Sequence, residues 1–141
     1  VYDYANGDKY IGDFKEGKRE GIGECKFTNG ESYTGEWKNN QINGKGNYNF
    51  RNGNTYEGDF IDGIMEGQGT YKFKNGNLYI GEFKGGRREG IGVFTYTNGN
   101  KYIGEFKNGN MDGQGTFTYP NGDKRSVFGK MDNQSTELNV Q

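Results

Sequence analysis

The sequence has 141 residues and a formal net charge of −1, and only 29% of its residues are hydrophobic. Aromatic side chains make up 16% of the chain, more than half of that hydrophobic fraction, which excludes a conventional aliphatic core. The near-zero charge supplies no long-range field toward nucleic acid, and no apolar run approaches the roughly 18 residues of a membrane-spanning helix. We therefore expect no nucleic-acid partner.

A sequence unit of 23 residues recurs along most of the chain. Each copy opens with Tyr-x-Gly, an acidic residue and an aromatic residue, and it continues through Gly-x-Gly and two further aromatics to a closing Asn-Gly. A fixed period in this range predicts an array in which each unit packs on its neighbours. Residues 1–9 read as a partial copy, so we expect the sequence to be a piece of a longer array. The full copies span residues 10–32, 33–55, 56–78, 79–101 and 102–124.

The first full copy contains Cys25, the only cysteine, at a position where the other copies have Tyr or Phe. Because the sequence has no histidine that could activate the thiol, we interpret Cys25 as a small buried apolar residue. A single cysteine also excludes an intramolecular disulfide, which fits a reducing compartment.

The unit 56–78 predicts two β-strands. Its frequent glycines exclude a helix, and aromatic or Gly residues alternate with polar ones in residues 56–60 and again in 67–73. The two strands are expected to share one aromatic face. The four residues 63–66 read as the loop between them, and each copy opens this loop with Gly or Asn, as expected where the backbone needs a positive φ.

The second connection contains the Asn-Gly pair, such as Asn75 and Gly76. A two-residue type I′ turn would set the polar face of one strand against the aromatic face of the next. A three-residue loop, in which Gly follows a type I turn as a left-handed bulge residue, keeps the faces matched. Pro120, at the place where a type I turn favours proline, supports this loop. The sequence therefore predicts an all-β fold, an elongated single-layer antiparallel meander of stacked β-hairpins.

The meander also predicts which residues lie opposite each other within a hairpin. Each glycine is expected to leave room for an aromatic ring, which explains why glycine is tolerated in the strands. On the other face, acidic residues at the fourth position of each unit and Lys at the sixth predict a solvated ladder of weak ion pairs. The expected opposite pairs are Gly58 with Tyr71, Gly69 with Phe60, and Tyr56 with Phe73.

The sixth copy is incomplete. Residues 125–129 occupy the place where it would begin, but its Tyr and Gly are replaced. We expect a closing strand there that covers the last edge of the sheet. Residues 130–141 are polar in composition and read as a loose tail.

The pattern Tyr-x-Gly-[Asp/Glu]-[Phe/Trp]-x-x-Gly-x-x-x-Gly-x-Gly resembles the MORN repeat (membrane occupation and recognition nexus) over residues 10–124. The resemblance implies a rod-like sheet of stacked hairpins with an aromatic groove along one face. Members of the family serve as binding and assembly modules: the name suggests phospholipid, whereas other members dock a peptide helix in the groove or pair through terminal repeats. The departures are few, since Asn40 replaces the loop Gly, Ile61 replaces a Lys and Cys25 replaces a ring.

The sequence lacks the residues of an enzyme site. With no histidine, one Cys and three Ser, it offers neither a catalytic triad nor a His/Cys metal site. The Gly-x-Gly pairs recur in mid-strand without a following helix or a Lys-Ser/Thr pair, which argues against a phosphate loop. We therefore expect no catalytic activity, no cofactor and no metal.

Protein binding is the leading functional hypothesis. A single-layer sheet has no second layer to bury its aromatic face, so part of that face should stay accessible to an apolar peptide or an amphipathic helix. The alternative is that the rings pack only on glycines and on one another. The candidate groove residues are Tyr33, Trp37, Tyr56, Phe60, Tyr79, Phe83, Tyr102 and Phe106.

Association with anionic phospholipid is the alternative function. Two loops carry adjacent basic residues, although each contributes only about 1 kcal/mol near an anionic leaflet and the neighbouring Glu20 and Glu89 oppose it. Open strand edges also predict a homodimer through the terminal repeats. Either function fits a cytoplasmic location, at the cytoskeleton or at a membrane. The possible lipid-binding residues are Lys18, Arg19, Arg87 and Arg88.

Overall fold

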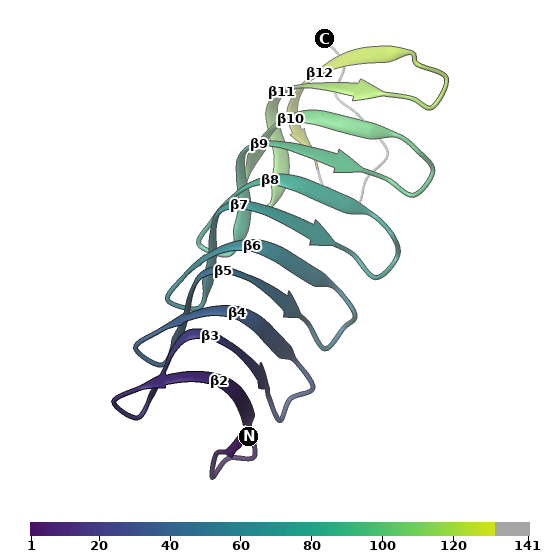
Figure 1. The fold of residues 1–141 in the computed structure, drawn as a ribbon. Coiled ribbons are helices and arrows are strands. Elements are labelled where there is room, and N and C mark those ends of the chain that lie inside the picture. The colour runs from purple at the N-terminus through teal and green to yellow at the C-terminus, as the bar shows by residue number, and fades with distance from the viewer. Residues whose placement is uncertain (132–141) are drawn as a thin grey trace.

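The computed structural model describes residues 1–131, which form one sheet (Figure 1). Its 12 strands follow one another in sequence order, neighbouring strands are antiparallel, and no helix occurs within the described residues. The predicted all-β meander of hairpins is confirmed. The strands are β1 (Tyr2–Asp3), β2 (Lys9–Lys15), β3 (Lys18–Lys26), β4 (Ser32–Lys38), β5 (Gln41–Asn49), β6 (Thr55–Ile61), β7 (Ile64–Lys72), β8 (Leu78–Lys84), β9 (Arg87–Thr95), β10 (Lys101–Lys107), β11 (Asn110–Thr118) and β12 (Lys124–Met131).

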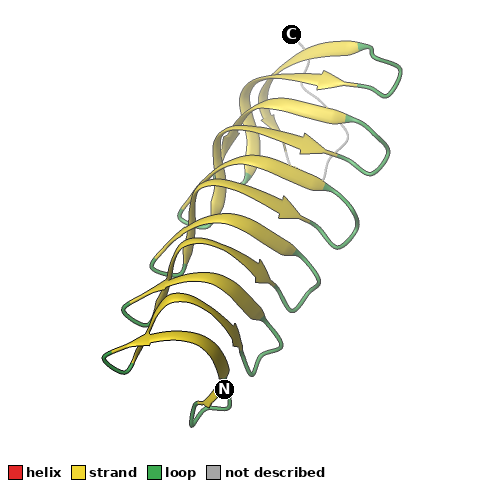
Figure 2. Ribbon diagram, in the orientation of Figure 1, coloured by secondary structure: helices red, strands yellow, loops and turns green. Residues whose placement is uncertain are grey.

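The strands bend into arcs, and the stacked arcs make an elongated trough (Figure 1). Short turns follow one rim of the trough and longer loops follow the other (Figure 2). The first strands lie at one end of the trough and β12 lies at the other. Each repeat therefore contributes one hairpin, and the hairpins stack along the long axis.

The loop at each Asn-Gly pair is the predicted three-residue loop. After β7, the Gly76 N–H donates a hydrogen bond to the Phe73 carbonyl oxygen at 2.9 Å, and the Phe73 N–H donates one to the Asn77 carbonyl oxygen at 2.9 Å. Gly76 has φ +100°, the left-handed value that the bulge residue requires. The loop after β11 makes the same bonds, with Pro120 at the predicted place in the turn.

The connection on the other rim is shorter than predicted. Strand β6 ends at Ile61 and β7 begins at Ile64, so Asp62 and Gly63 alone form the turn, instead of residues 63–66. Their φ values of 49° and 80° indicate a type I′ turn, and the predicted positive φ at Gly63 is confirmed. The predicted length was wrong because the twist of this turn matches that of the strands, which lets both strands continue up to it.

The strand pairing within each hairpin differs from the predicted pairing by four residues next to the turn, because the turn is shorter than predicted, and by two residues beyond a β-bulge. The bulge sets residues 66–68 of β7 opposite Asp59 alone and so takes up part of the shift. The three predicted pairs are therefore wrong. Because the shift is an even number of residues, every side chain keeps its predicted face. The observed pairs are Tyr56 with Tyr71, Gly58 with Gly69, and Phe60 with Met65.

Glycine lies opposite glycine in an unbroken column from Gly12 to Gly115, across ten strands. The Tyr that opens each unit lies across this column. A Cβ atom on Gly69, for example, would stand only 2.3 Å from Cε1 of Tyr56. The Tyr56 hydroxyl also donates a hydrogen bond to the Asp59 carbonyl oxygen at 2.8 Å. Glycine is needed in these strands because a ring occupies the place of its side chain.

The glycine column ends at Val127 of β12, which lies opposite Gly115. Arg125 stands where a sixth unit would have its first Tyr, so no such ring covers residue 127. The Val127 side chain is buried there. Arg125 in place of Tyr thus leaves room for Val127 in place of Gly. Strand β12 includes residues 125–129 and the first two residues of the expected tail, whereas residues 132–141 lie outside the described part of the chain.

The acidic residues at the fourth position form no ion pair with the sixth-position lysines within residues 1–131, and of these acidic residues only Asp59 forms an ion pair there, with Lys45 Nζ at 2.8 Å. Four others bind backbone N–H groups instead. The Asp13 carboxylate accepts a hydrogen bond from the Ile22 N–H at 3.1 Å, and the Glu82 carboxylate accepts one from the Ile91 N–H at 2.9 Å. These N–H groups belong to the bulged segments of the following strands. The carboxylates therefore stabilise the bulges. The sequence pattern did not predict this role because it did not predict the bulges. The same bonds join Glu36 to the Lys45 N–H and Glu105 to the Gln114 N–H.

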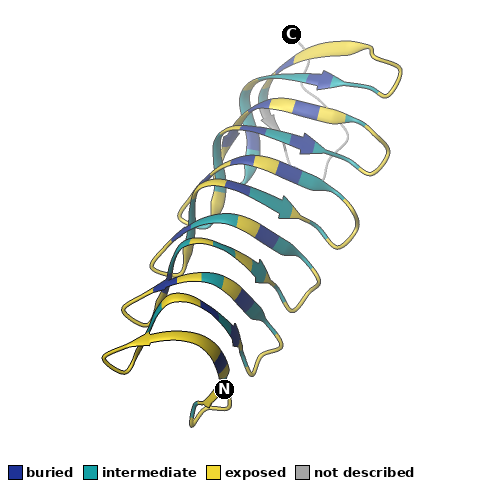
Figure 3. Ribbon diagram, in the orientation of Figure 1, coloured by how far each residue is buried: buried dark blue, intermediate teal, exposed yellow. Residues whose placement is uncertain are grey.

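The two faces of the sheet differ strongly in burial. Buried positions recur at matching places along successive strands (Figure 3). On the face that carries the aromatic rings, hereafter the inner face, most rings are buried. On the other face, hereafter the outer face, side chains such as Ile80, Ile91 and Ile103 remain 45% to 56% exposed. The hydrophobic core of this single-layer sheet is therefore a layer of rings on one side.

Candidate functional site

The eight aromatic residues predicted as groove residues form the core. Their exposed fractions lie between 0% and 5%, so the expectation of a broadly accessible stripe is wrong, although Phe60 and Phe83 each line a cavity of the inner face. The rings of successive units meet edge to face, and the Tyr33 ring centroid lies 5.4 Å from those of both Trp37 and Phe60. Rings from neighbouring hairpins thus bury one another without a second layer. The buried residues are Tyr33, Trp37, Tyr56, Phe60, Tyr79, Phe83, Tyr102 and Phe106.

A second set of aromatic residues provides the accessible surface of the inner face. The aromatic residues at the eighteenth position of each unit, beside the three-residue loops, are partly buried, and so are Tyr48 and Tyr71 at the sixteenth position. In the last two units the sixteenth-position rings, Phe94 and Phe117, are buried. Centroid distances of 4.8 Å from Tyr48 to Phe50, 5.6 Å from Phe50 to Tyr71 and 4.9 Å from Tyr71 to Phe73 join them into one stripe. The two aromatics per unit were visible in the sequence, but the order of burial among the rings was not.

Two adjoining cavities follow this stripe. One has a volume of about 320 Å³, and it is lined by Tyr48 and Phe50 near one rim and by Gly63 and Gly86 in turns of the other rim. The second has a volume of about 210 Å³, and Gly86 lines it as well. Residues from both rims line the same cavity, which places the aromatic face on the inside of the trough. We define the inner groove as Tyr48, Phe50, Met65, Tyr71, Phe73 and Arg88.

Hydrogen bonds across neighbouring units orient the rings of the inner groove. The Tyr48 hydroxyl donates to Glu31 Oε1 at 2.6 Å, and the Asn54 side-chain amide donates to the Tyr71 hydroxyl at 3.1 Å. The bond from Tyr48 lowers the pKa of Glu31, while burial raises the pKa of Tyr48 above its ordinary value. Both hydrogen bonds hold the tyrosine rings in defined positions.

The four basic residues predicted as possible lipid contacts do not gather on one surface. Lys18 and Arg87 are exposed beside the two-residue turns, whereas Arg19 and Arg88 lie among the aromatic rings of the inner face. The two pairs lie on β3 and β9, six strand spacings apart in the sheet, or roughly 29 Å. Arg87 also lines the smaller cavity of the inner face, but only Arg19 and Arg88 take part in the aromatic layer.

Arg19 is anchored within the protein. Its Nε donates a hydrogen bond to the Asn40 side-chain oxygen at 2.7 Å, and its Nη2 donates to the Asn40 carbonyl oxygen at 3.0 Å. The guanidinium carbon lies 4.5 Å from the ring centroid of Trp37. Cys25, which is buried as interpreted from the sequence, lies nearby, and burial raises the pKa of its thiol.

Arg88 occupies the equivalent position two-thirds of the way along the sheet, in the wall of the smaller cavity. Its guanidinium carbon lies 5.6 Å from the ring centroids of both Phe73 and Phe94. Nη1 is buried and has no hydrogen-bond partner among residues 1–131. Burial lowers the pKa of Arg88 below its ordinary value, although an arginine remains charged at neutral pH.

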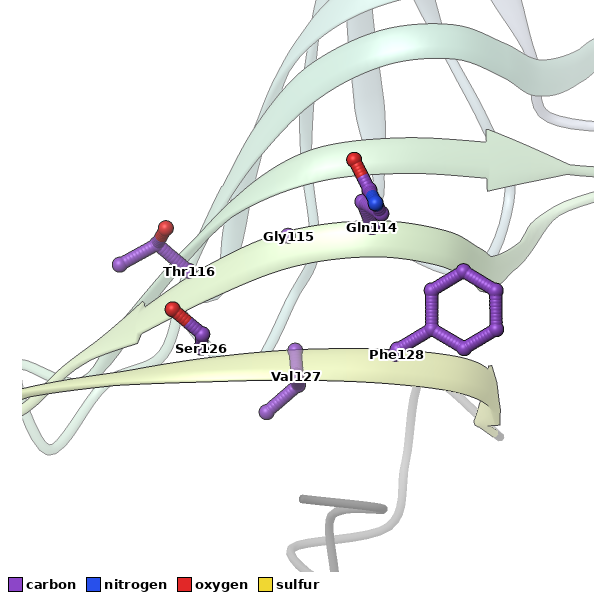
Figure 4. A pocket seen from close by; sticks show the side chains of 6 residues that line it. All are labelled: Gln114, Gly115, Thr116, Ser126, Val127 and Phe128. Atoms are coloured by element: carbon purple, nitrogen blue, oxygen red, sulfur yellow. The ribbon is translucent and has the colours of Figure 1, made fainter. Parts of the chain in front are cut away.

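The outer face carries a hollow at the last edge of the sheet, with a volume of about 620 Å³ (Figure 4). Gln114, Thr116, Ser126 and Phe128 point from β11 and β12 around it. The short side chains of Thr116 and Ser126, next to Gly115, leave the backbone poorly covered there. The lining offers no charged side chain, so the inner groove remains the better candidate site.

Residues 1–131 offer neither a metal site nor a membrane-spanning helix. No group of three or more His, Cys, Asp or Glu side chains in this part of the chain could hold a metal ion. Among the same residues, no helix is long and apolar enough to cross a membrane. The inner groove and its arginine are therefore the features from which a function can be argued.

Comparisons with known proteins agree with this architecture. No curated protein matches the sequence. Among solved structures, the TCP domain of SAS-4 (dCPAP) from Drosophila melanogaster, solved in complex with a proline-rich motif of Ana2 (dSTIL), is similar with a TM-score of 0.50 at 16% identity. The match covers 99% of this chain and 82% of that one, and at this identity it shows the fold alone. The MORN repeat family model matches residues 10–32, 33–55, 56–78, 79–101 and 102–124, and the chain belongs to the MORN-repeat family.

Proposed function

We propose that this chain is a non-catalytic binding module that docks a protein partner in the inner groove. The single observation that carries the proposal is the stripe of partly exposed rings, with two adjoining cavities, on an otherwise closed aromatic core. Partly exposed aromatic surface in a concave site is the usual anchor for an apolar side chain of a partner. The partner is an extended peptide or an amphipathic helix whose apolar residues face the groove.

The comparisons support this reading in outline. Repeats of this family are used as binding modules, and the similar TCP domain was solved with a peptide. Of the eight buried rings, Phe60 and Phe83 line the two cavities, and the others support the inner groove from below. Tyr48, Phe50, Tyr71 and Phe73 make the direct contacts in our proposal.

The test is a selection of short peptides from a random library on the immobilised wild-type chain, followed by affinity measurements on variants. Phe50→Ser and Phe73→Ser, at partly exposed groove positions, are expected to weaken selected peptides by about tenfold or more. Ile80→Ser and Ile103→Ser are the matched controls, since both side chains are exposed on the outer face. Selected peptides that lose affinity only with the outer-face variants would overturn the groove proposal.

Anionic phospholipid remains the second candidate, motivated by the exposed basic residues Lys18 and Arg87 at the two-residue turns. Each adds only about 1 kcal/mol at an anionic surface, and they lie far apart along the sheet. Flotation with phosphoinositide-containing vesicles tests this function. Equal recovery of the wild type and of a Lys18→Ser/Arg87→Ser variant would remove these two residues from it.

Self-association through the terminal repeats is a further proposal. Strand β1 covers only the first residues of β2, since its pairing consists of Tyr2 with Tyr10 and Asp3 with Lys9. The remainder of β2 presents unpaired backbone groups, which recruit other strands. Sedimentation over a range of protein concentrations measures this association, and a monomer at every concentration would refute it.

A further inference from the structure

The tenth residue of each repeat lies in the inner face, opposite or near the aromatic residue at the fifth position. Three repeats have an apolar side chain there and two have arginine. Arg19 and Arg88 therefore hold the same place in the fold, and they differ in what lies beside them. These tenth residues are Arg19, Ile42, Met65, Arg88 and Met111.

The hydrogen bonds of each arginine depend on the second residue of the two-residue turn in the following repeat. Asn40 holds that place beside Arg19, and its side chain accepts the Arg19 Nε hydrogen bond. Gly109 holds it beside Arg88. The turns are otherwise alike, because the Asn40 N–H donates to the Arg19 carbonyl oxygen at 2.9 Å and the Gly109 N–H donates to the Arg88 carbonyl oxygen at 3.0 Å. Gly109 has no side-chain amide, so Arg88 lacks the acceptor that the Asn40 side chain gives to Arg19.

The nearby acidic side chains do not supply another acceptor. Glu66 accepts a hydrogen bond from the Gly85 N–H at 2.9 Å, and Glu89 accepts one from the Asn108 N–H at 2.8 Å. Both carboxylates thus bind the backbone of the turns. Nη1 of Arg88 remains buried without a partner among the described residues. Arg88 lines the cavity and its side chain makes no hydrogen bond within residues 1–131, so an anion that enters the cavity can supply an acceptor to the guanidinium.

We propose that Arg88 and the cavity that it lines form a subsite for the carboxylate of an Asp or Glu side chain on the peptide docked in the inner groove. The inference rests on the proposed function and adds the chemistry of the partner to it. The Met65, Tyr71 and Phe73 side chains line the same cavity, so the residue next to the acid on the peptide is apolar. The bound motif is therefore an acidic residue adjacent to an apolar one.

Both Arg87 and Arg88 line the cavity, but Arg87 is exposed at the start of β9, whereas Arg88 lies among the aromatic rings. The Arg88 guanidinium matches one carboxylate through charge-assisted hydrogen bonds. The cavity also opens inside the trough, between its two rims, where an extended chain can lie along the rings.

The fold itself supplies the variant that tests this subsite. Gly109→Asn copies the arrangement around Arg19 and gives Arg88 an internal acceptor. Asn suits the positive φ of 86° at Gly109, because Asn40 already adopts 72° at the equivalent place. Arg88→Met removes the charge, and Met at this repeat position is compatible with the fold at Met65 and Met111.

The experiment measures short peptides selected on the wild-type chain, each as the acidic form and with Glu→Gln or Asp→Asn, by fluorescence polarisation. In wild type the amide form is expected to bind about tenfold or more weakly than the acid. In Gly109→Asn and Arg88→Met the two forms are expected to bind alike. An NMR shift of the Arg88 side-chain N–H signals on addition of the acidic form is a second, direct readout.

The outcomes separate the two proposals. If no peptide depends on Phe50 or Phe73, the proposed function fails. Peptides that depend on these rings but bind Gly109→Asn and wild type equally in both forms would leave the groove standing and overturn the Arg88 subsite. Capture of phosphatidylinositol bisphosphate vesicles by wild type and not by Arg88→Met, with no acid preference among peptides, would also overturn it.

Discussion

Single residues in this fold are constrained by a ring that covers them. At the glycine column the space for a side chain is already taken by the Tyr of the same hairpin, as Tyr56 takes it above Gly69. The neighbouring turn glycine Gly63 shows the opposite case, since no atom lies within 4 Å of a Cβ there. Glycine is therefore required for different reasons within one repeat. In the strand there is no space for a side chain, and in the turn the backbone needs a positive φ.

The first prediction compares these two glycines. Gly69→Ala is expected to lower the free energy of unfolding by about 1–3 kcal/mol, because its Cβ displaces the Tyr56 ring from its place. Gly63→Asn is expected to stay within about 0.5 kcal/mol of wild type, since Asn40 holds the equivalent turn position. Urea denaturation followed by Trp37 fluorescence measures both. Equal losses in the two variants would contradict the steric role of the column.

At the scale of the hairpin, the bulge and its carboxylate decide the strand pairing. The bulge shifts the pairing by two residues between the glycine pair and the turn, and the fourth-position carboxylate binds an N–H of the bulged segment. The repeat therefore uses one acidic side chain to fix an irregular strand. This explains the acidic residue at that position better than the weak ion pairs that its sequence neighbours suggest.

The second prediction concerns this carboxylate. Glu82→Ala leaves the Ile91 N–H without its acceptor and is expected to lower stability by about 1–2 kcal/mol. Glu57→Ala serves as the control, because Glu57 is exposed and its side chain has no hydrogen bond among the described residues. Thermal unfolding of the two variants tests the difference. The assignment is refuted if Glu57→Ala is the more damaging change.

Buried tyrosines make the hairpins sensitive to alkaline pH. Burial raises the pKa of Tyr33 and of Tyr102 to about 12, and it raises the pKa of Tyr56 and Tyr79 as well. In the unfolded chain a tyrosine ionises near pH 10. Above that value the unfolded state releases protons that the folded state retains, so stability is fully present below about pH 10 and falls toward pH 12.

The third prediction is therefore a loss of urea resistance between about pH 10 and pH 12, with little change between about pH 7 and pH 9. Tyr33→Phe is expected to lose part of this pH dependence, because it removes one ionisable group, and to lose about 1 kcal/mol at neutral pH with the bond to the Glu36 carbonyl oxygen. A flat stability profile up to pH 12 in the wild type would show that these hydroxyls do not titrate with unfolding.

At the scale of the whole molecule, the repeat allows the sheet to be shortened by a complete hairpin. The pairing of β5 with β6 and that of β7 with β8 follow one pattern, so removal of the hairpin formed by β6 and β7 brings β5 and β8 together in an equivalent pairing. Stability in such arrays is nearly the sum of units and of their interfaces. Rings and turn bonds also connect each unit to the next, as in the bond from Gly85 N–H to Glu66.

The fourth prediction tests this additivity. Deletion of residues 56–78 is expected to give a shorter folded protein whose denaturant m-value falls by about one fifth, in proportion to the surface buried. Deletion of residues 56–66 removes an odd number of positions and exchanges the two faces of the following strands, so that variant should aggregate. Circular dichroism and sedimentation compare them. A soluble, folded product from the shorter deletion would contradict the face assignment.

The sequence by itself determined the period, the two faces and the three-residue loops, because each depends on residues close together in the chain. Asn-Gly with Pro120 specifies its loop locally, and alternation assigns each side chain to a face whatever the exact pairing. For the same reason the family assignment needed no coordinates. The two-residue turn and the bulge were missed because a bulge changes the pairing without changing the pattern of faces.

Only the tertiary structure showed which rings are accessible and which arginine has no side-chain hydrogen-bond acceptor among residues 1–131. Tyr33 and Tyr48 have the same side chain on the same inner face. Tyr33 is buried because its ring lies against Gly35 and Gly46 of the glycine column, whereas Tyr48 lines the inner groove. Arg19 and Arg88 are likewise equivalent in the repeat. Their difference arises from the residue that the next unit places beside them, Asn40 or Gly109, and a contact between units becomes visible only when the hairpins are stacked.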